Sequence, residues 1–138
     1  MATSNRELFV NLPVRNLNAS MAFFAGLGFT FNPQFTDEKA ACMVLSEKGY
    51  VMLLEDAFFR TFTSREICDS ARATETLVAF ACASRAEVDE LTDKALATGG
   101  TQAAPNQDHG FMYSRAFYDI DGHHWEAIWM DPAAVAQG

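Results

Sequence analysis

Residues 7–14 read Glu-Leu-Phe-Val-Asn-Leu-Pro-Val, and an apolar side chain stands at every second position from Leu8 to Val14. Successive side chains of an extended chain point to opposite faces. The even-numbered positions would therefore form one apolar face, and the other face would hold Glu7, Phe9, Asn11 and Pro13. A period of two residues predicts a β-strand with one face buried.

The residues after this strand predict one helix and three more strands. Residues 17–27 carry apolar side chains at helical spacing after Asn16, a candidate N-cap, and Gly28 stands where a helix often ends in a left-handed conformation. Strand-like runs separated by turn residues follow at 29–36, 41–46 and 50–55. The first half is therefore expected to be β-α-β-β-β.

The second half repeats this order about 68 residues further on, where residues 75–78 align with residues 7–10. A strand over 75–83 precedes a helix over 85–97, in which Ser84 and Glu87 form a capping box. Further strands are predicted over 101–104, 112–118 and 124–130.

The predicted fold class is α+β, with two tandem βαβββ modules in one domain, residues 1–138. Module one spans residues 6–58, module two spans 74–131, and a connector over 59–73 contains a short helix near 64–69. The modules are expected to form a half-open, curved mixed β-sheet barrel around a cavity, because sheets twist and each helix covers only one face. The helices would lie outside, and the connector would either link the modules or act as a lid.

The amino-acid composition disfavours some classes of binding partner. Hydrophobic residues make up 49% and charged residues 20%, as in a folded globular protein, and the formal net charge is −8. An acidic surface disfavours nucleic acids and anionic membranes. Three cysteines without a CxxC pair favour reduced thiols. No apolar stretch reaches the roughly 20 residues of a membrane-spanning helix, so a cytoplasmic protein is expected.

Several motifs carry a resemblance to a known family. They are Leu-Pro-Val-Arg-Asn-Leu at 12–17, Ser-Met-Ala-Phe-Phe at 20–24, Leu-Gly-Phe at 27–29 and Phe-Tyr-Asp-Ile-Asp-Gly-His-His-Trp-Glu at 117–126. With them the chain resembles, over nearly its whole length, the vicinal oxygen chelate superfamily of glyoxalase I, bleomycin-resistance proteins and extradiol dioxygenases. Within it, the chain looks most similar to the predicted lactoylglutathione-lyase-like proteins.

The resemblance implies a place for a divalent metal, held by one side chain from the first and one from the last strand of each module. Glu126 matches one of these four positions, whereas Phe9, Met52 and Leu77 stand at the others. Phenylalanine and leucine cannot ligate a metal, and methionine suits soft metals only. The site is therefore expected to be incomplete. A replacement set of Glu126, His124 and Glu75, with Asn11, would suit Zn, Ni or Mn.

Other polar side chains are candidates for binding a ligand. His124 and Glu126 lie two positions apart on one strand, so they would share a face as metal ligands, as an acid–base pair or as a polar pair at a wet cavity mouth. Tyr113 and Arg115 would also share a face. If that face is the inner one, Arg115 would anchor a carboxylate or phosphate; otherwise it is exposed.

We expect from the sequence a homodimer that binds a small, partly apolar molecule with weak or no metal dependence. Glu126 is the candidate catalytic residue, and the candidate ligand-binding residues are Phe9, Asn11, Met52, Leu77, Tyr113, Arg115 and His124. One alternative is a divalent-metal-dependent lyase of the lactoylglutathione lyase type. Another is a drug-sequestering resistance protein.

Overall fold

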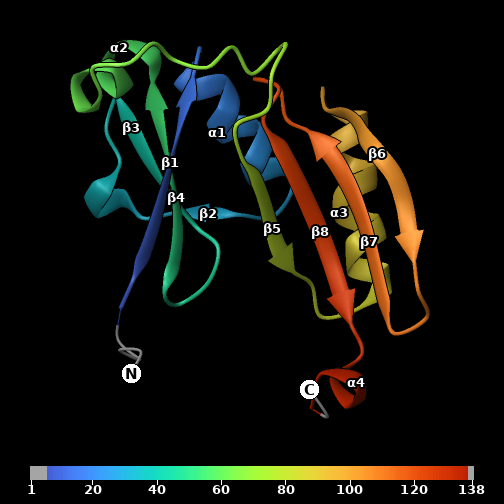
Figure 1. Ribbon diagram of the computed structural model, residues 1–138. Helices are drawn as coiled ribbons and strands as arrows, with labels where there is room; N and C mark the ends of the chain where they lie inside the picture. The colour runs from blue at the N-terminus through green and yellow to red at the C-terminus, as the bar shows by residue number, and fades with distance from the viewer. Residues whose placement is uncertain (1–5, 137–138) are drawn as a thin grey trace. The chain divides into compact units, whose positions relative to one another are not determined.

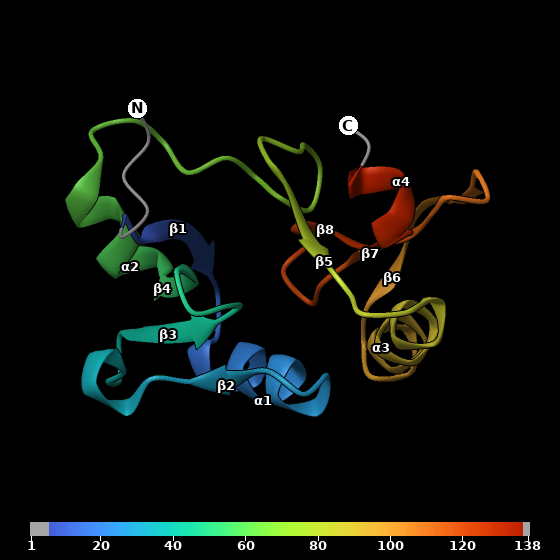
Figure 2. The same cartoon turned by 90° about the horizontal axis from the view of Figure 1, so that it is seen from below.

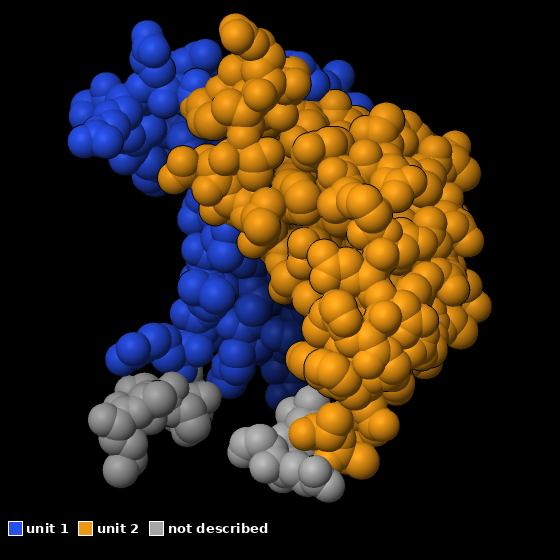
Figure 3. All heavy atoms as spheres, turned by 45° about the vertical axis from the view of Figure 1, so that its right-hand side comes forward, with its two compact units in different colours: residues 1–67 blue, residues 68–138 orange. Residues whose placement is uncertain are grey.

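The computed structural model describes residues 6–136. The chain divides into two compact units, residues 1–67 and residues 68–138, which Figure 3 shows in blue and orange. Each unit holds one four-stranded mixed sheet with its own helices, so the prediction of two βαβββ modules in an α+β fold is confirmed. We call the two units module one and module two from here on.

Module one follows the predicted order of elements (Figure 1). Strand β1 (Leu8–Val14) leads into helix α1 (Leu17–Gly26), and strands β2 (Thr30–Phe31), β3 (Ala40–Val44) and β4 (Gly49–Glu55) complete the sheet. The sheet order is β1-β4-β3-β2, with β1 parallel to β4 and the other pairs antiparallel. Strand β1 is therefore an edge strand of this sheet.

Local sequence explains how α1 begins and ends. The Asn16 side chain accepts a hydrogen bond from the Ala19 N–H at 3.0 Å, which satisfies one of the free donors of the first turn. The chain turns away at Gly28, whose φ of 102° is one that few other residues adopt. The helix contributes Leu17, Phe23 and Phe24 to a core that Leu12 and Val14 of β1 complete, whereas Leu8 at the start of the strand is exposed. The predicted apolar face of residues 8–14 is thus the one that packs against the helix.

Module two repeats the topology. Its strands are β5 (Leu77–Ala81), β6 (Thr101–Asp108), β7 (Met112–Tyr118) and β8 (His124–Met130), in the order β5-β8-β7-β6, with β5 parallel to β8. Helix α3 (Arg85–Ala97) lies along one face of this sheet, and α4 (Pro132–Ala136) follows β8 (Figures 1 and 2). The predicted capping box is present. Ser84 accepts from the Glu87 N–H at 3.1 Å, and Glu87 accepts from the Ala83 N–H at 2.7 Å.

Three local predictions differ from the structure. Residues 29–36 form only the short β2, because Asn32 caps a 3₁₀ turn, η1 (Pro33–Phe35), that Pro33 begins. The helix predicted near residues 64–69 is absent, and helical turns occur earlier, in α2 (Asp56–Phe59) and η2 (Arg60–Phe62). Strand β6 runs four residues beyond its predicted end, with irregular pairing to β7.

The second part of the predicted connector belongs to module two. The Ser70 hydroxyl donates to the Asp121 carbonyl at 2.6 Å, and a Cβ at Gly122 would collide with the Ser70 backbone. The turn before β8 is therefore in direct contact with Ser70. The boundary between the units falls between residues 67 and 68. None of the helices between residues 6 and 136 has the length and hydropathy needed to cross a membrane.

Candidate ligand-binding faces

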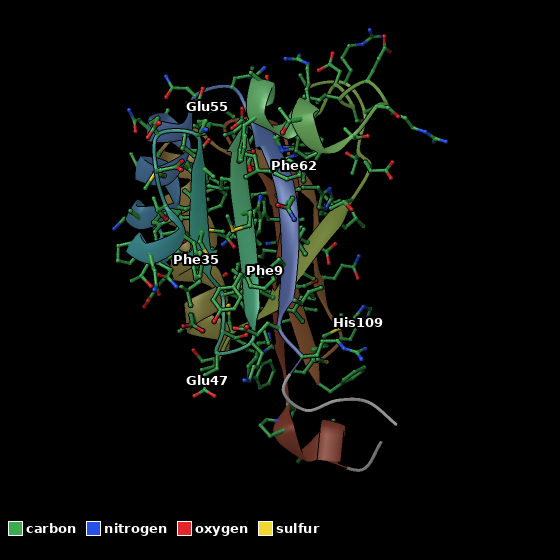
Figure 4. All side chains as sticks on the ribbon, turned by 90° about the vertical axis from the view of Figure 1, so that its left-hand side faces the viewer. Phe9, Phe35, Glu47, Glu55, Phe62 and His109 are labelled. Atoms are coloured by element: carbon green, nitrogen blue, oxygen red, sulfur yellow. The ribbon has the colours of Figure 1, made fainter. Side chains whose placement is uncertain are left out.

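Each sheet has one face that its main helix does not cover, and most of the predicted site residues lie on these faces. In module one, the register pairs Phe9 with Tyr50 and Asn11 with Met52. These four side chains share the face opposite the buried Val51 and Leu53, and Figure 4 looks onto it. We call it the open face of module one. Phe9 is 47% exposed there. Phe9, Asn11 and Met52 are thus brought together as predicted.

An aromatic pair and a carboxylate dominate one end of this open face. The rings of Phe9 and Tyr50 are stacked, with centroids 5.0 Å apart and planes 14° apart. The Tyr50 hydroxyl donates to the Glu47 carbonyl at 3.1 Å. Partial burial, and then the neighbouring Glu7 carboxylate, raise the pKa of Tyr50 above its usual value. Neither Glu7 nor Tyr50 was among the predicted site residues, although the alternation over residues 7–14 put Glu7 on the same predicted face as Phe9.

Glu55 is a carboxylate on β4 that would reach the position of Met52 only if the strands slipped in register. The structure shows no slip, because Asn11 pairs with Met52 and Val14 pairs with Glu55. Since side chains alternate, Glu55 belongs to the helix-covered face at the far end of β4 from Phe9 (Figure 4). It therefore adds no donor to the open face.

In module two, the corresponding open face carries His124 and Glu126. Leu77 pairs with His124 and Ala79 pairs with Glu126, so Leu77 also lies on this face. The Nε2 atom of His124 and the Oε1 atom of Glu126 are 3.7 Å apart, which is too long for an ordinary hydrogen bond. The two side chains are only 11% and 31% exposed. The rings of Tyr118 and His124 pack edge to face, with their centroids 5.5 Å apart.

The His124 ring has an unsatisfied atom. Its Nε2 is buried and has no hydrogen-bond partner among the residues that the structure describes. Leaving a buried polar atom unpaired costs about 1–3 kcal/mol, and such atoms are rare in folded proteins. The arrangement is therefore suited to a group from outside the chain that can pair with this nitrogen while Glu126 binds a second polar atom.

Tyr113 and Arg115 lie on the other face of the same sheet. Arg115 Nη1 donates to Asp89 at 3.0 Å and to Asp93 at 2.8 Å, and the Tyr113 hydroxyl donates to Asp89 at 2.6 Å. The hydrogen bond from Tyr113 is the main cause that lowers the pKa of Asp89. Both acidic residues belong to α3, so this face is the helix-covered one. The structure does not bring Tyr113 and Arg115 together with Glu126. The Arg115 guanidinium is already paired with two carboxylates of α3.

Glu75 also falls outside the open face. The strand predicted to start at residue 75 starts at Leu77, and Glu75 is an exposed residue of the bend before it. A hard divalent cation takes six or more oxygen ligands, and a structural zinc takes four ligands. Within residues 6–136 no group of three or more His, Cys, Asp or Glu side chains could hold a metal. With only His124 and Glu126 adjacent, the donor set does not fit a resident divalent metal of the implied kind.

Comparison with known proteins agrees with this architecture. A family model described as bleomycin resistance protein-like N-terminal matches residues 6–46. The structure of hypothetical protein SA1046 from S. aureus superposes with a TM-score of 0.75 at 26% identity, covering 89% of this chain and 92% of that chain. No curated protein matches the chain in sequence.

Two further solved structures show the same fold. A glyoxalase-related enzyme from Fulvimarina pelagi has a TM-score of 0.74 and 18% identity, and the match covers 90% of this chain and 87% of that chain. The fosfomycin resistance protein FosX from Listeria monocytogenes has a TM-score of 0.64 and 22% identity, with coverages of 94% and 92%. The chain therefore has the glyoxalase/bleomycin resistance/dioxygenase fold, and its first 40 or so described residues match the bleomycin resistance protein-like N-terminal family.

Proposed function

We propose that the protein binds small, partly apolar molecules on the open faces of its sheets, with weak or no dependence on a metal. The main support is the His124–Glu126 pair, a partly buried and incompletely satisfied pair of polar side chains on an otherwise apolar strand face. Ligand sites commonly combine an apolar lining with a few polar groups that orient the ligand. A homodimer, expected from the sequence, is part of this proposal.

The chemistry of the pair defines what it can recognise. The unpaired His124 Nε2 can accept from a ligand hydroxyl, or donate to a ligand carbonyl in its other tautomer. Glu126 can accept a hydrogen bond from a ligand N–H or O–H, or take up a proton from a ligand held next to it. Leu77 and Ala79, opposite these two residues on β5, would contact apolar parts of the same molecule. If the protein is an enzyme, Glu126 is the residue we assign to proton transfer.

Two alternatives have some support. The same His–carboxylate pair would contribute two ligands in a metal-dependent lyase of the lactoylglutathione lyase type, but the donors available fall short of a full set. A drug-sequestering protein is supported by the bleomycin resistance protein-like match over residues 6–46. The formal charge of −8 would favour a cationic drug in that case.

Metal analysis and ligand-induced stabilisation test the proposal together. The purified chain, the variant Glu126→Gln and the control Glu90→Gln, which neutralises an exposed carboxylate on α3, would be analysed for bound metal by mass spectrometry. Their melting temperatures would then be measured against a panel of small aromatic and polar compounds. A ligand at about 100 times its Kd adds about 2.7 kcal/mol to the free energy of unfolding.

We expect little bound metal in all three proteins. We also expect at least one compound to raise the melting temperature of the native chain and of Glu90→Gln but not of Glu126→Gln. One tightly held Ni, Zn or Mn ion per chain that is lost only in Glu126→Gln would instead establish the metal-dependent alternative. If no compound stabilises the native chain, the binding proposal is rejected.

A further inference from the structure

The exposed Phe9 ring offers a second, distinct recognition element. Tyr50 stacks on one side of Phe9 from the neighbouring strand β4. Because β1 is the edge strand, no strand of the module one sheet lies on the other side of Phe9. Within the described residues of this module, the sheet therefore leaves the outer face of the ring uncovered, in keeping with the 47% exposure of Phe9.

Polar atoms flank that ring along β1. Asn11 stands two residues after Phe9 in β1, so its side chain lies on the same face at about 7 Å along the strand. Glu7 immediately precedes β1. The Asn11 amide nitrogen donates to the Phe9 carbonyl at 3.4 Å, which leaves the amide oxygen as an acceptor. The carboxylate of Glu7 lies close enough to Tyr50 to act on its hydroxyl. Phe9 and its stacked partner Tyr50 thus have a carboxylate and an amide oxygen beside them.

We propose that Phe9, Glu7 and Asn11 bind a planar, positively charged molecule, that is, an aromatic organic cation such as an N-alkylated heteroaromatic ring. The proposal rests on the function proposed above, for which it names the ligand class of the open face of module one. The face of an aromatic ring attracts a cation through its quadrupole, and a second planar ring adds stacking energy. Acceptor oxygens on both sides favour a positive charge there and disfavour an anion, as does the formal net charge of −8.

The matching experiment compares a cationic probe with its neutral counterpart. N-methylquinolinium and quinoline have nearly the same shape but differ in charge, so their affinities separate stacking from charge recognition. Isothermal titration calorimetry would measure both affinities on the native chain at about 20 mM and about 200 mM salt, since salt screens exposed charges.

Three substitutions and two controls in module one localise the site. Phe9→Leu removes the ring but keeps an apolar side chain, and Phe9→Tyr keeps the ring. Glu7→Gln removes the negative charge. The controls are Phe35→Leu, an exposed phenylalanine in η1 that Figure 4 shows apart from Phe9, and Glu38→Gln, an exposed carboxylate of the same module.

We expect Phe9→Leu and Glu7→Gln each to weaken N-methylquinolinium binding about threefold to fivefold at low salt. Phe9→Tyr and both controls should bind it as the native chain does. Quinoline should bind more weakly and should not respond to Glu7→Gln. Equal affinities for the two probes, or equal losses in Phe35→Leu and Phe9→Leu, would overturn the proposal.

The two proposals fail in different ways. If the native chain binds neither probe while another compound stabilises it through Glu126, the cation site at Phe9 is rejected and the binding function stands. If neither probe binds and no compound of the panel stabilises the native chain, both proposals are rejected.

Discussion

The two modules have the same βαβββ topology but hold their helices with different interactions. In module one, α1 contributes Phe23 and Phe24 to the core, and Phe24 also meets Phe29 edge to face with ring centroids 6.2 Å apart. In module two, α3 contributes the smaller Val88 and Ala95 and is joined to β7 through Arg115. Apolar packing depends little on pH or salt, whereas ion pairs depend on both. The modules should therefore respond differently to solution conditions.

The largest expected effect comes from removing a core ring of module one. Phe24 is fully buried, so Phe24→Ala should lower the free energy of unfolding of module one by about 3–5 kcal/mol, through lost burial and the cavity that remains. Both tryptophans, Trp125 and Trp129, lie in module two, so tryptophan fluorescence reports that module alone. In urea, the circular dichroism signal should show an early transition that the fluorescence signal lacks.

The circular dichroism and fluorescence transitions should separate because each compact unit has its own core. Trp125→Phe, a conservative change in module two, serves as the converse control, because it should shift the fluorescence transition and leave the module one transition in place. Identical shifts of both signals in Phe24→Ala would mean that the modules unfold as one cooperative unit.

A smaller effect is expected from the ionic contact of module two. Arg115→Met should lower the free energy of unfolding by about 1–3 kcal/mol, because Asp89 and Asp93 lose the largely buried guanidinium that pairs with both of them. Asp93→Asn should cost less than about 1 kcal/mol, since Asp93 is 68% exposed and water screens its pair with Arg115. Urea unfolding followed by tryptophan fluorescence measures both. Equal losses in the two variants would show that Arg115 acts through the exposed pair rather than through Asp89.

The topology and several helix ends could be predicted because they depend on local sequence. The alternation over residues 8–14, the capping box at Ser84 and Glu87, and the glycine after α1 are all present in the structure. The short helix near 64–69 could not be placed correctly, because such a helix is decided by packing rather than by propensity. The helical turns of this segment occur earlier, in α2 and η2, which directly follow β4.

The candidate site was only partly predictable, because a period of two residues tells which side chains share a face but not which face meets the helix. His124 and Glu126 were correctly paired on one face. Tyr113 and Arg115 were correctly paired too, but the carboxylates of α3 that bind them lie more than 20 residues away in sequence. Tyr50 was missed for the same reason, since its place beside Phe9 follows from the register of β1 and β4.

The smallest predicted effect is a pH dependence confined to module two. The Arg85 guanidinium is placed over the rings of Tyr113 and Trp129 and forms two hydrogen bonds with Asp108, at 2.9 and 2.8 Å. The hydrogen bond from Arg85 is the main cause that holds the pKa of Asp108 well below its usual range. A carboxyl group whose pKa is lowered by folding stabilises the folded state above its unfolded-state pKa of about 4. That contribution is lost as the pH falls through the lower, folded-state pKa.

Asp108→Asn should therefore lower the melting temperature of module two slightly near neutral pH, and the difference from the native chain should narrow as the pH falls well below about 4. Thermal unfolding followed by tryptophan fluorescence over a pH series measures this difference. Burial raises the pKa of Asp119 in the same module, so that group acts with the opposite sign, but it is present in both proteins and cancels in the comparison. A difference that stays constant or widens in acid would show that Asp108 stabilises module two by means other than its charge, such as its bond to the Gly110 N–H.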